Sequence, residues 1–188
     1  MVVLEIYLIF VLLPYTVFSE SCSVEFIRSG LVSKFIPTAP QEILKIKYED
    51  ISVECGTKVQ QHLTSNPPKV DFSANENELY TLLMIDPDAP TPFNHSLAFV
   101  RHWVVVNIPG NTINYGFVNT DYMQPHPEKG GDHTHYHRYT FLIYKQSKTE
   151  PQEKYSGSRL GFNLMDYVTS HKLQTLLAGN FMQVREEM

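Results

Sequence analysis

Apolar residues along this chain recur mainly at the spacing of β-strands. Leu44, Ile46 and Tyr48 occupy every second position of one segment, which predicts a strand with one buried face. The segments 78–85 and 101–108 are almost continuously apolar, which is typical of central strands covered on both sides. We therefore expect a sheet whose centre is buried between two layers.

A further strand is predicted over Tyr136–Gln146. In an extended chain His137, Tyr139, Phe141 and Ile143 would share one face, because side chains alternate between the two faces of a strand. This pattern places an imidazole and a phenol side by side on the same surface.

Helical spacing appears only late in the chain. Asn163 is a suitable N-cap for a helix in which Leu164, Tyr167, Val168 and His171 share a face. No other segment has this combination of cap and period, so we expect one or two helices near the C-terminus.

Turn residues divide the remaining strands. Pro67 and Pro68 fit neither a helix nor a central strand, so they predict a turn that leads into a short strand. Gly179 and Asn180 are predicted to interrupt the pattern before a short strand at 181–184. The expected fold class is mainly β, with a mostly antiparallel arrangement.

The first residues are typical of a secretory signal peptide. Within residues 1–19 the apolar core Ile6–Leu13 is followed by a proline and then by small residues that suit cleavage before Glu20. An uncleaved membrane anchor is the alternative, but the apolar run is short for a membrane span. We expect a secreted, extracellular protein without a stable transmembrane anchor, in which residues 20–188 form a single domain.

Two other features fit an oxidising compartment. Cys22 and Cys55 are the two cysteines of the chain, and we predict a disulfide between them, with two buried thiols as the alternative. Asn94 begins an Asn-His-Ser sequon and is a predicted glycosylation site in an exposed loop. The formal net charge is −5 and no basic stripe is present, so no nucleic-acid partner is expected.

Charged and polar residues gather at the ends of the predicted central strands. The stretch "DPDAPTP" follows a buried strand and holds Asp86, Pro87 and Asp88 in a loop stiffened by proline. These carboxylates suit a binding site, although a turn with local hydrogen bonds would use the same residues. His102 enters the next apolar strand and is either a core histidine or the wall of a pocket.

Four histidines crowd a short stretch of the chain: His126, His133, His135 and His137. Alternating histidines on a strand can ligate a metal, but no Cys-x-x-Cys or His-Glu-x-x-His motif accompanies them, and we expect no metal ion and no cofactor. No sequence motif of a nucleophilic enzyme is present, whereas general acid–base chemistry is not excluded by residue type.

Taken together, these segments resemble the phosphatidylethanolamine-binding protein family, which includes the Raf kinase inhibitor proteins. The resemblance rests on "LLMIDPDAPTP", "RHWVVVNIPGN", "PEKGG" and "HRYTFLIYKQ", and it continues through "GFNLMDYV" and "LAGNFMQV". It implies a large central antiparallel sheet, a smaller second sheet and peripheral helices. It also implies a small pocket for anions such as phosphate or a phosphoethanolamine head group.

Carried over by motif position, the resemblance implies a ligand-binding site made of Asp86, Pro87, Asp88, His102, Pro127, His137 and Tyr139. The glycine that the family places before His-Arg-Tyr is replaced by His135, and the segment before His137 is about three residues longer than is typical of the family. We therefore expect a histidine-rich lip beside the pocket, where histidines would tune binding with pH.

Three functions remain open at this point. The first is a secreted, non-catalytic protein that binds phosphatidylethanolamine or related phosphate and carboxylate head groups. The second is a serine protease inhibitor or another protein-directed regulator, with a protease as the partner. The third is a metal-assisted hydrolase that uses the histidines.

Overall fold

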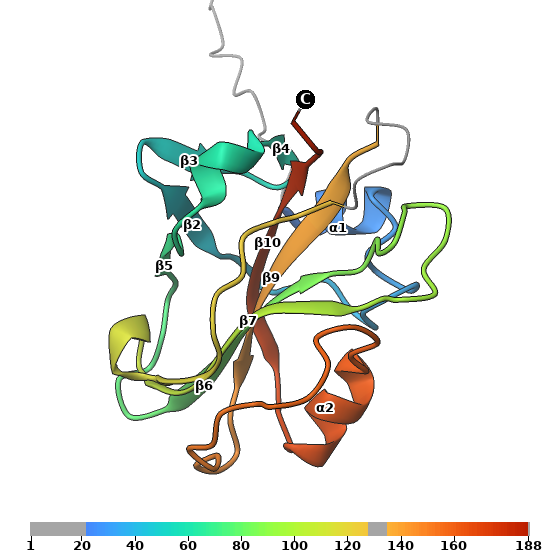
Figure 1. The fold of residues 1–188 in the computed structure, drawn as a ribbon. Coiled ribbons are helices and arrows are strands. Elements are labelled where there is room, and N and C mark those ends of the chain that lie inside the picture. Colours follow the sequence, from blue (N-terminus) through green and yellow to red (C-terminus); the bar gives the residue numbers. More distant parts are fainter. Residues whose placement is uncertain (1–21, 128–134, 188) are drawn as a thin grey trace, which may run out of the picture.

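The structure is a computed structural model, and it describes residues 22–127 and 135–187 (Figure 1). Its larger sheet has seven strands in the order β1-β10-β9-β6-β7-β8, with β4 also paired to β10. These strands are β1 (Glu42–Ile43), β4 (Thr57–Lys58), β6 (Leu79–Asp86), β7 (Val100–Pro109), β8 (Phe117–Thr120), β9 (His137–Lys145) and β10 (Leu176–Val184). The smaller sheet has the order β3-β2-β5, with β2 (Lys45–Tyr48), β3 (Ile51–Val53) and β5 (Lys69–Asp71).

The centre of the large sheet is buried on both faces, as the apolar runs predict. Along β6, Leu82 and Met84 pack in the core that faces the small sheet, whereas Leu83 and Ile85 pack in the core on the opposite face. The alternation therefore divides the apolar side chains between two cores, and the mainly β fold class is confirmed.

The large sheet is mixed rather than wholly antiparallel. β6, β7, β8 and β9 pair antiparallel with their neighbours, and so does β10 with β9. The two short strands β1 and β4 instead run parallel to β10 along its other edge. The predicted, mostly antiparallel arrangement is thus confirmed. The parallel pairing is confined to this edge and was not predicted, because two-residue strands carry no pattern that reveals their direction.

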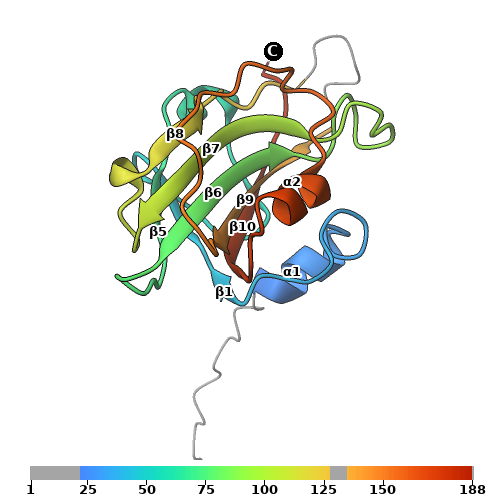
Figure 2. The same cartoon turned by 90° about the horizontal axis from the view of Figure 1, so that it is seen from below.

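Two helices cover one face of the large sheet, and the small sheet lies on the other (Figure 2). α2 (Leu164–Ser170) begins as predicted, since the Asn163 side chain accepts a hydrogen bond from the Asp166 N–H. α1 (Cys22–Arg28) was not predicted: it is short, and Phe26 is its one buried residue. Two 3-10 turns, η1 (Gln61–Thr64) and η2 (Ile113–Tyr115), pack Leu63 and Ile113 against the core on the side of the small sheet.

β10 runs unbroken through Gly179 and Asn180, so the predicted interruption there is wrong. The buried Asn180 amide donates hydrogen bonds to the backbone carbonyls of Leu44 and Val53, which ties the strand to the small sheet. Gly179 lies against Pro40, where a side chain would not fit. Both residues are typical of turns in the local sequence, but in the folded protein they lie within a strand and are required by its tertiary contacts.

The predicted disulfide is confirmed. Cys22, the first residue of α1, is bonded to Cys55, which precedes β4. The predicted signal peptide, residues 1–19, lies outside the described residues. Within the part of the chain that the structure does describe, no helix is long and apolar enough to cross a membrane.

Candidate functional site

The centre of the site is a buried pair formed by Asp86 and His137. Asp86 ends β6 and His137 begins β9, and these strands are antiparallel neighbours, so their ends meet at one edge of the sheet. The Asp86 Oδ2 and His137 Nδ1 atoms lie 2.8 Å apart, and the residues are 3% and 5% exposed. Because the carboxylate accepts, the proton on His137 is held at Nδ1. The sequence-predicted partners are therefore brought together.

Asp88 lies in a different environment, although the sequence groups it with Asp86. Its carboxylate accepts the Arg138 backbone N–H and Nε at 2.8 Å each and Arg138 Nη2 at 2.6 Å. Arg138 also donates to the Ser29 carbonyl, which follows α1. Asp88 thus faces the helix side of the sheet and holds the loop to β9, whereas its own N–H donates to Asp86 Oδ1 at 2.7 Å.

His102 reaches the site through an irregularity in β7. The register passes from Trp103 opposite Met84 to Arg101 opposite Ile85, which leaves His102 as the extra residue of a bulge. Its ring lies edge-on to the Tyr139 ring, with centroids 4.9 Å apart.

The electrostatic state of His102 follows from its surroundings. Burial lowers the pKa of this imidazole below its usual value, and the nearby Asp86 opposes that shift. His102 Nδ1 lies 2.9 Å from the Met123 carbonyl, so this nitrogen carries the proton and Nε2 of the neutral ring is a hydrogen-bond acceptor. The site therefore offers an acceptor at His102 rather than a cation.

Tyr139 completes the group as a neutral phenol. It is fully buried, and burial, followed by the charge of Asp86, raises its pKa well above the usual value. Its oxygen accepts the His126 backbone N–H at 3.1 Å. The phenol and the His137 imidazole thus both lie near the Asp86 carboxylate.

The two prolines of the predicted site are buried, and two further histidines make contacts near its loops. Pro87 follows Asp86 directly, and Pro127 follows His126, whose N–H bonds Tyr139. His95, which no sequence motif marks as a site residue, places Nδ1 2.8 Å from the Pro87 carbonyl oxygen and thereby holds the loop of Asp86, Pro87 and Asp88. The His135 ring packs edge-on to Phe93, with centroids 4.8 Å apart.

The histidine-rich lip is described only in part. The His126 ring lies 3.2 Å from the Gln61 amide, and His133 lies outside the described residues. Among the residues that the structure describes, no cluster of three or more His, Cys, Asp or Glu side chains is arranged to hold a metal ion. The predicted role of the lip in pH tuning stays a prediction.

Asn94 lies in an exposed loop, as a glycosylation site requires. Its side-chain oxygen accepts the Ser96 backbone N–H at 3.0 Å, which forms a local turn. Modification of Asn94 stays a prediction.

The fold and this site define a class of protein: two packed sheets with a buried carboxylate, two imidazoles and a phenol at the strand ends. Residues 39–183 match the model of the family described as "Phosphatidylethanolamine-binding protein". The chain therefore belongs to the phosphatidylethanolamine-binding protein family.

Two curated relatives extend this result. The chain is 32% identical over 163 residues to the "26 kDa secreted antigen" of Toxocara canis, a match that covers 83% of this chain and 61% of the antigen. It is also 32% identical over 162 residues to "Putative odorant-binding protein A5" of Drosophila melanogaster, covering 82% of this chain and 76% of that protein. The chain thus spans less than two thirds of the antigen's length.

A solved structure shares the fold at lower identity. The carboxypeptidase Y inhibitor, in the crystal structure of its complex with the cognate proteinase, has a TM-score of 0.76 and 22% sequence identity. The match covers 88% of this chain and 95% of the inhibitor. At this identity the likeness concerns the fold alone.

Proposed function

We propose that this chain is a secreted, non-catalytic protein that binds a small phosphate or carboxylate head group at the Asp86–His137 site. The observation that carries the proposal is the 2.8 Å contact between the buried Asp86 carboxylate and the His137 imidazole, with His102 and Tyr139 beside it. Polar side chains that converge on one point at a strand end, among apolar surroundings, are the usual arrangement of a small-ligand site.

The chemistry of the cluster favours a zwitterionic head group such as that of phosphatidylethanolamine. His137 supplies a donor for a phosphate oxygen, and Asp86 offsets the charge of the imidazolium that anion binding would favour. The unprotonated Nε2 of His102 and the Asp86 carboxylate supply acceptors for an ammonium group. No bond needs to break, so binding alone accounts for the groups present.

Secretion is part of the proposal. The Cys22–Cys55 disulfide suits an oxidising compartment, and the Toxocara canis relative is named as a secreted antigen. Expression of the full chain in a secreting host tests this point: we expect the protein in the medium with Glu20 at its N-terminus. Retention in the membrane fraction with residues 1–19 intact would contradict it.

The binding test is calorimetric titration with O-phosphoethanolamine. We expect saturable binding by the wild type, weakened roughly 10- to 100-fold by His137→Gln, because a charge-assisted hydrogen bond is lost. His62→Gln is the matched control, since His62 is exposed and bonded to Glu187 instead. A folded wild type that does not bind, or equal affinity in His137→Gln, would overturn the proposal.

The protease-directed alternative is tested in a separate inhibition assay. The carboxypeptidase Y inhibitor shares the fold with this chain, and its structure was solved with a proteinase bound. At 22% identity this likeness does not transfer a partner, so inhibition of serine proteases is assayed as the competing outcome.

A further inference from the structure

We propose that this protein has a second ligand site, on the helix side of the large sheet, for a small anion that carries two phosphate groups. The site is a cavity of about 440 Å³ between the segment that follows α1, the start of β9 and the end of β10. This volume lies within the range of roughly 300–1,000 Å³ that small-molecule sites occupy. The lining is mainly polar and includes Ser29, Lys34, Arg138 and Gln183.

Strand pairing brings polar side chains together at this end of the sheet. Gln183 of β10 is the register partner of Lys58 in β4 and of Arg138 in β9. Register partners point to the same face of a sheet. Arg138 points to the helix side, because its guanidinium donates to the Ser29 carbonyl after α1. Lys58, Gln183 and Arg138 thus form a row across three strands on that face.

Tyr136 joins two cations to the cavity, which its side chain helps to line. Lys58 Nζ lies 4.6 Å from the centroid of the Tyr136 ring, and the guanidinium carbon of Arg185 lies 5.3 Å from it. An aromatic face attracts a cation within about 6 Å of its centroid, so the ring holds both side chains in place. Two like charges at one ring repel each other, and an anion bound beside them would offset this repulsion.

Lys34 brings a further positive charge from the segment that follows α1, and it lines the cavity directly. His95 Nδ1 donates to the Pro87 carbonyl oxygen, so His95 Nε2 accepts from the Lys34 ammonium at 2.7 Å. An ammonium group has three donors, and two of them remain for a ligand. Since Lys58 and Arg185 lie over Tyr136 instead, the positive charge is distributed over more than one point of the site.

The charges of the site add up to a net positive charge. One carboxylate, Asp88, lines the cavity, but it is fully buried and accepts three hydrogen bonds from Arg138. This pair therefore contributes no net charge. Within the part of the chain that the structure describes, no carboxylate forms an ion pair with Lys34, Lys58 or Arg185. Three cations thus remain without a counter-charge.

This arrangement favours an anion with more than one charged group. A single carboxylate would leave most of the positive charge uncompensated, and the ammonium group of phosphoethanolamine would be repelled. Two phosphate groups carry several negative charges and can place them at two points of the site. Lysine and arginine are also the residues that usually bind phosphate oxygens in proteins.

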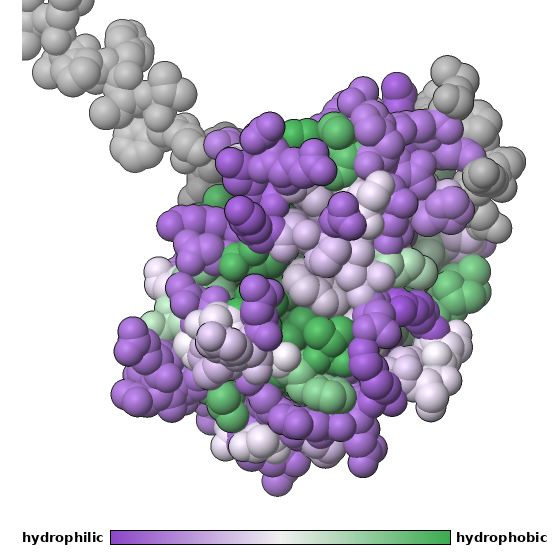
Figure 3. All heavy atoms as spheres, turned by 60° about the vertical axis from the view of Figure 1, so that its left-hand side comes forward, coloured by the Kyte–Doolittle hydropathy of each residue, from purple (hydrophilic) through white to green (hydrophobic). Residues whose placement is uncertain are grey.

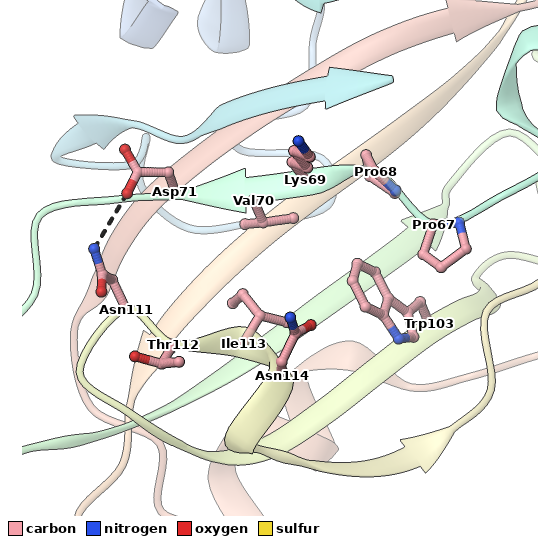
Figure 4. Close-up of a pocket in the computed structure, with 10 residues that line it drawn as sticks. All are labelled: Pro67, Pro68, Lys69, Val70, Asp71, Trp103, Asn111, Thr112, Ile113 and Asn114. Carbon is pink, nitrogen blue, oxygen red and sulfur yellow. Dashed lines mark hydrogen bonds between the residues drawn. The ribbon is translucent and has the colours of Figure 1, made fainter. Parts of the chain in front are cut away.

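A cavity on the other side of the molecule provides a control. It has a volume of about 550 Å³ and lies between β5 and η2, where Lys69 and Asp71 line it and Asp71 accepts the Asn111 amide (Figure 4). Apolar side chains gather near the middle of this face of the molecule, with polar ones around them (Figure 3). Lys69 is exposed, so Lys69→Gln removes one positive charge from a cavity that lacks the cationic cluster.

Calorimetric titration with inorganic pyrophosphate tests the proposal. Excess O-phosphoethanolamine is present throughout, so that the Asp86–His137 site is occupied. We expect saturable binding that weakens as salt is added, because salt screens exposed charges. Inorganic phosphate, which has one phosphate group, should bind about tenfold more weakly or worse, since it loses the contacts of the second group. Fructose 1,6-bisphosphate serves as a second probe: if it binds more tightly than pyrophosphate, the site recognises two separated phosphates, and if more weakly, two linked ones.

Three variants locate the bound pyrophosphate. Lys34→Gln should weaken binding about three- to tenfold, and the double variant Lys58→Gln with Arg185→Gln should weaken it about tenfold or more, because charge-assisted hydrogen bonds are lost. These side chains are exposed, so their replacement should not disturb the fold. Lys69→Gln, which changes the net charge as Lys34→Gln does, should leave the affinity unchanged.

Any one of four results would overturn the proposal. They are a lack of saturable pyrophosphate binding, displacement of pyrophosphate by O-phosphoethanolamine, equal affinities for phosphate and pyrophosphate, and equal losses in Lys69→Gln and Lys34→Gln. Failure of pyrophosphate with retained O-phosphoethanolamine binding would remove this site and leave the proposed function standing. Pyrophosphate binding without O-phosphoethanolamine binding would support this site and remove the proposed function.

Discussion

Asp86 and Asp88 are two residues apart in the chain, yet they serve opposite sides of the large sheet. Asp86 is paired with His137 on the side of the small sheet, and Asp88 is paired with Arg138 on the side of α1. An imidazole can lose its proton at physiological pH, whereas a guanidinium stays charged. The first pair can therefore respond to a ligand or to pH, and the second is a permanent ion pair that holds the loop.

The largest expected effect comes from breaking the permanent pair. Asp88→Asn leaves the Arg138 guanidinium, whose side chain is 16% exposed, without its counter-charge. Removing one partner of a buried ion pair destabilises strongly, so we expect the free energy of unfolding to fall by about 3 kcal/mol. Urea denaturation followed by circular dichroism measures this change.

Asp86→Asn removes the same carboxylate charge from the other pair, so its effects on stability and binding are compared with those of Asp88→Asn. An imidazole, unlike a guanidinium, does not need a counter-charge, so we expect a loss of only about 1 kcal/mol, together with loss of O-phosphoethanolamine binding. Asp88→Asn should keep that binding at temperatures where it is folded. Equal losses of stability and of binding in the two variants would contradict the division of roles.

The sequence identified both carboxylates but not their different roles. Alternation in β9 predicted that His137 and Tyr139 share a face, and by the same rule Arg138 points the other way. The partner of Asp88 lies 50 residues away in the chain, and His95 acts through a backbone carbonyl across its loop. Neither contact can be predicted from the neighbouring residues in the sequence, because each depends on how segments of the chain pack in the folded structure.

The helix side of the sheet also shows where local patterns mislead. Gly179 predicts a turn by composition, but it lies within β10, opposite Leu142 of β9. Pro40 and the ring of Phe26 occupy the space that a side chain would need. The residue is small because α1 and its flanking segment approach the strand closely, and this reason is visible only in the packed structure.

We expect Gly179→Ala to destabilise the protein by about 2 kcal/mol, because the new methyl group would overlap the Pro40 ring. Thermal or urea unfolding measures the loss. Pro40→Ala in the same chain should recover part of it, since it removes the overlapping atoms.

Gly30→Ala is the control for backbone strain alone: its φ is +73° and a methyl group there meets no atom within 4 Å, so about 1 kcal/mol is expected. A Gly179→Ala loss that Pro40→Ala does not relieve would contradict the packing explanation.

On the small-sheet side, the smallest predicted effect is a dependence of stability on pH that arises from His102. Its pKa is lowered in the folded protein by burial, so the unfolded chain, with an ordinary value of about 6.5, takes up this proton first as the pH falls. The contribution of neutral His102 to stability is therefore complete above pH about 6.5. It is lost on acidification, with a slope of at most about 1.4 kcal/mol per pH unit, until the folded protein is protonated as well.

His102→Asn tests this assignment, because the amide can donate to the Met123 carbonyl in place of Nδ1 and does not titrate. We expect the variant to lose less stability than the wild type between pH 7 and pH 5 (both chosen for the assay), as measured by urea unfolding at each pH. His62→Asn, at an exposed histidine, is the control and should not flatten the profile in this way. An unchanged profile in His102→Asn would mean that the pKa of His102 is the same in the folded and the unfolded protein, which would contradict the assignment of His102 as an imidazole kept neutral by burial.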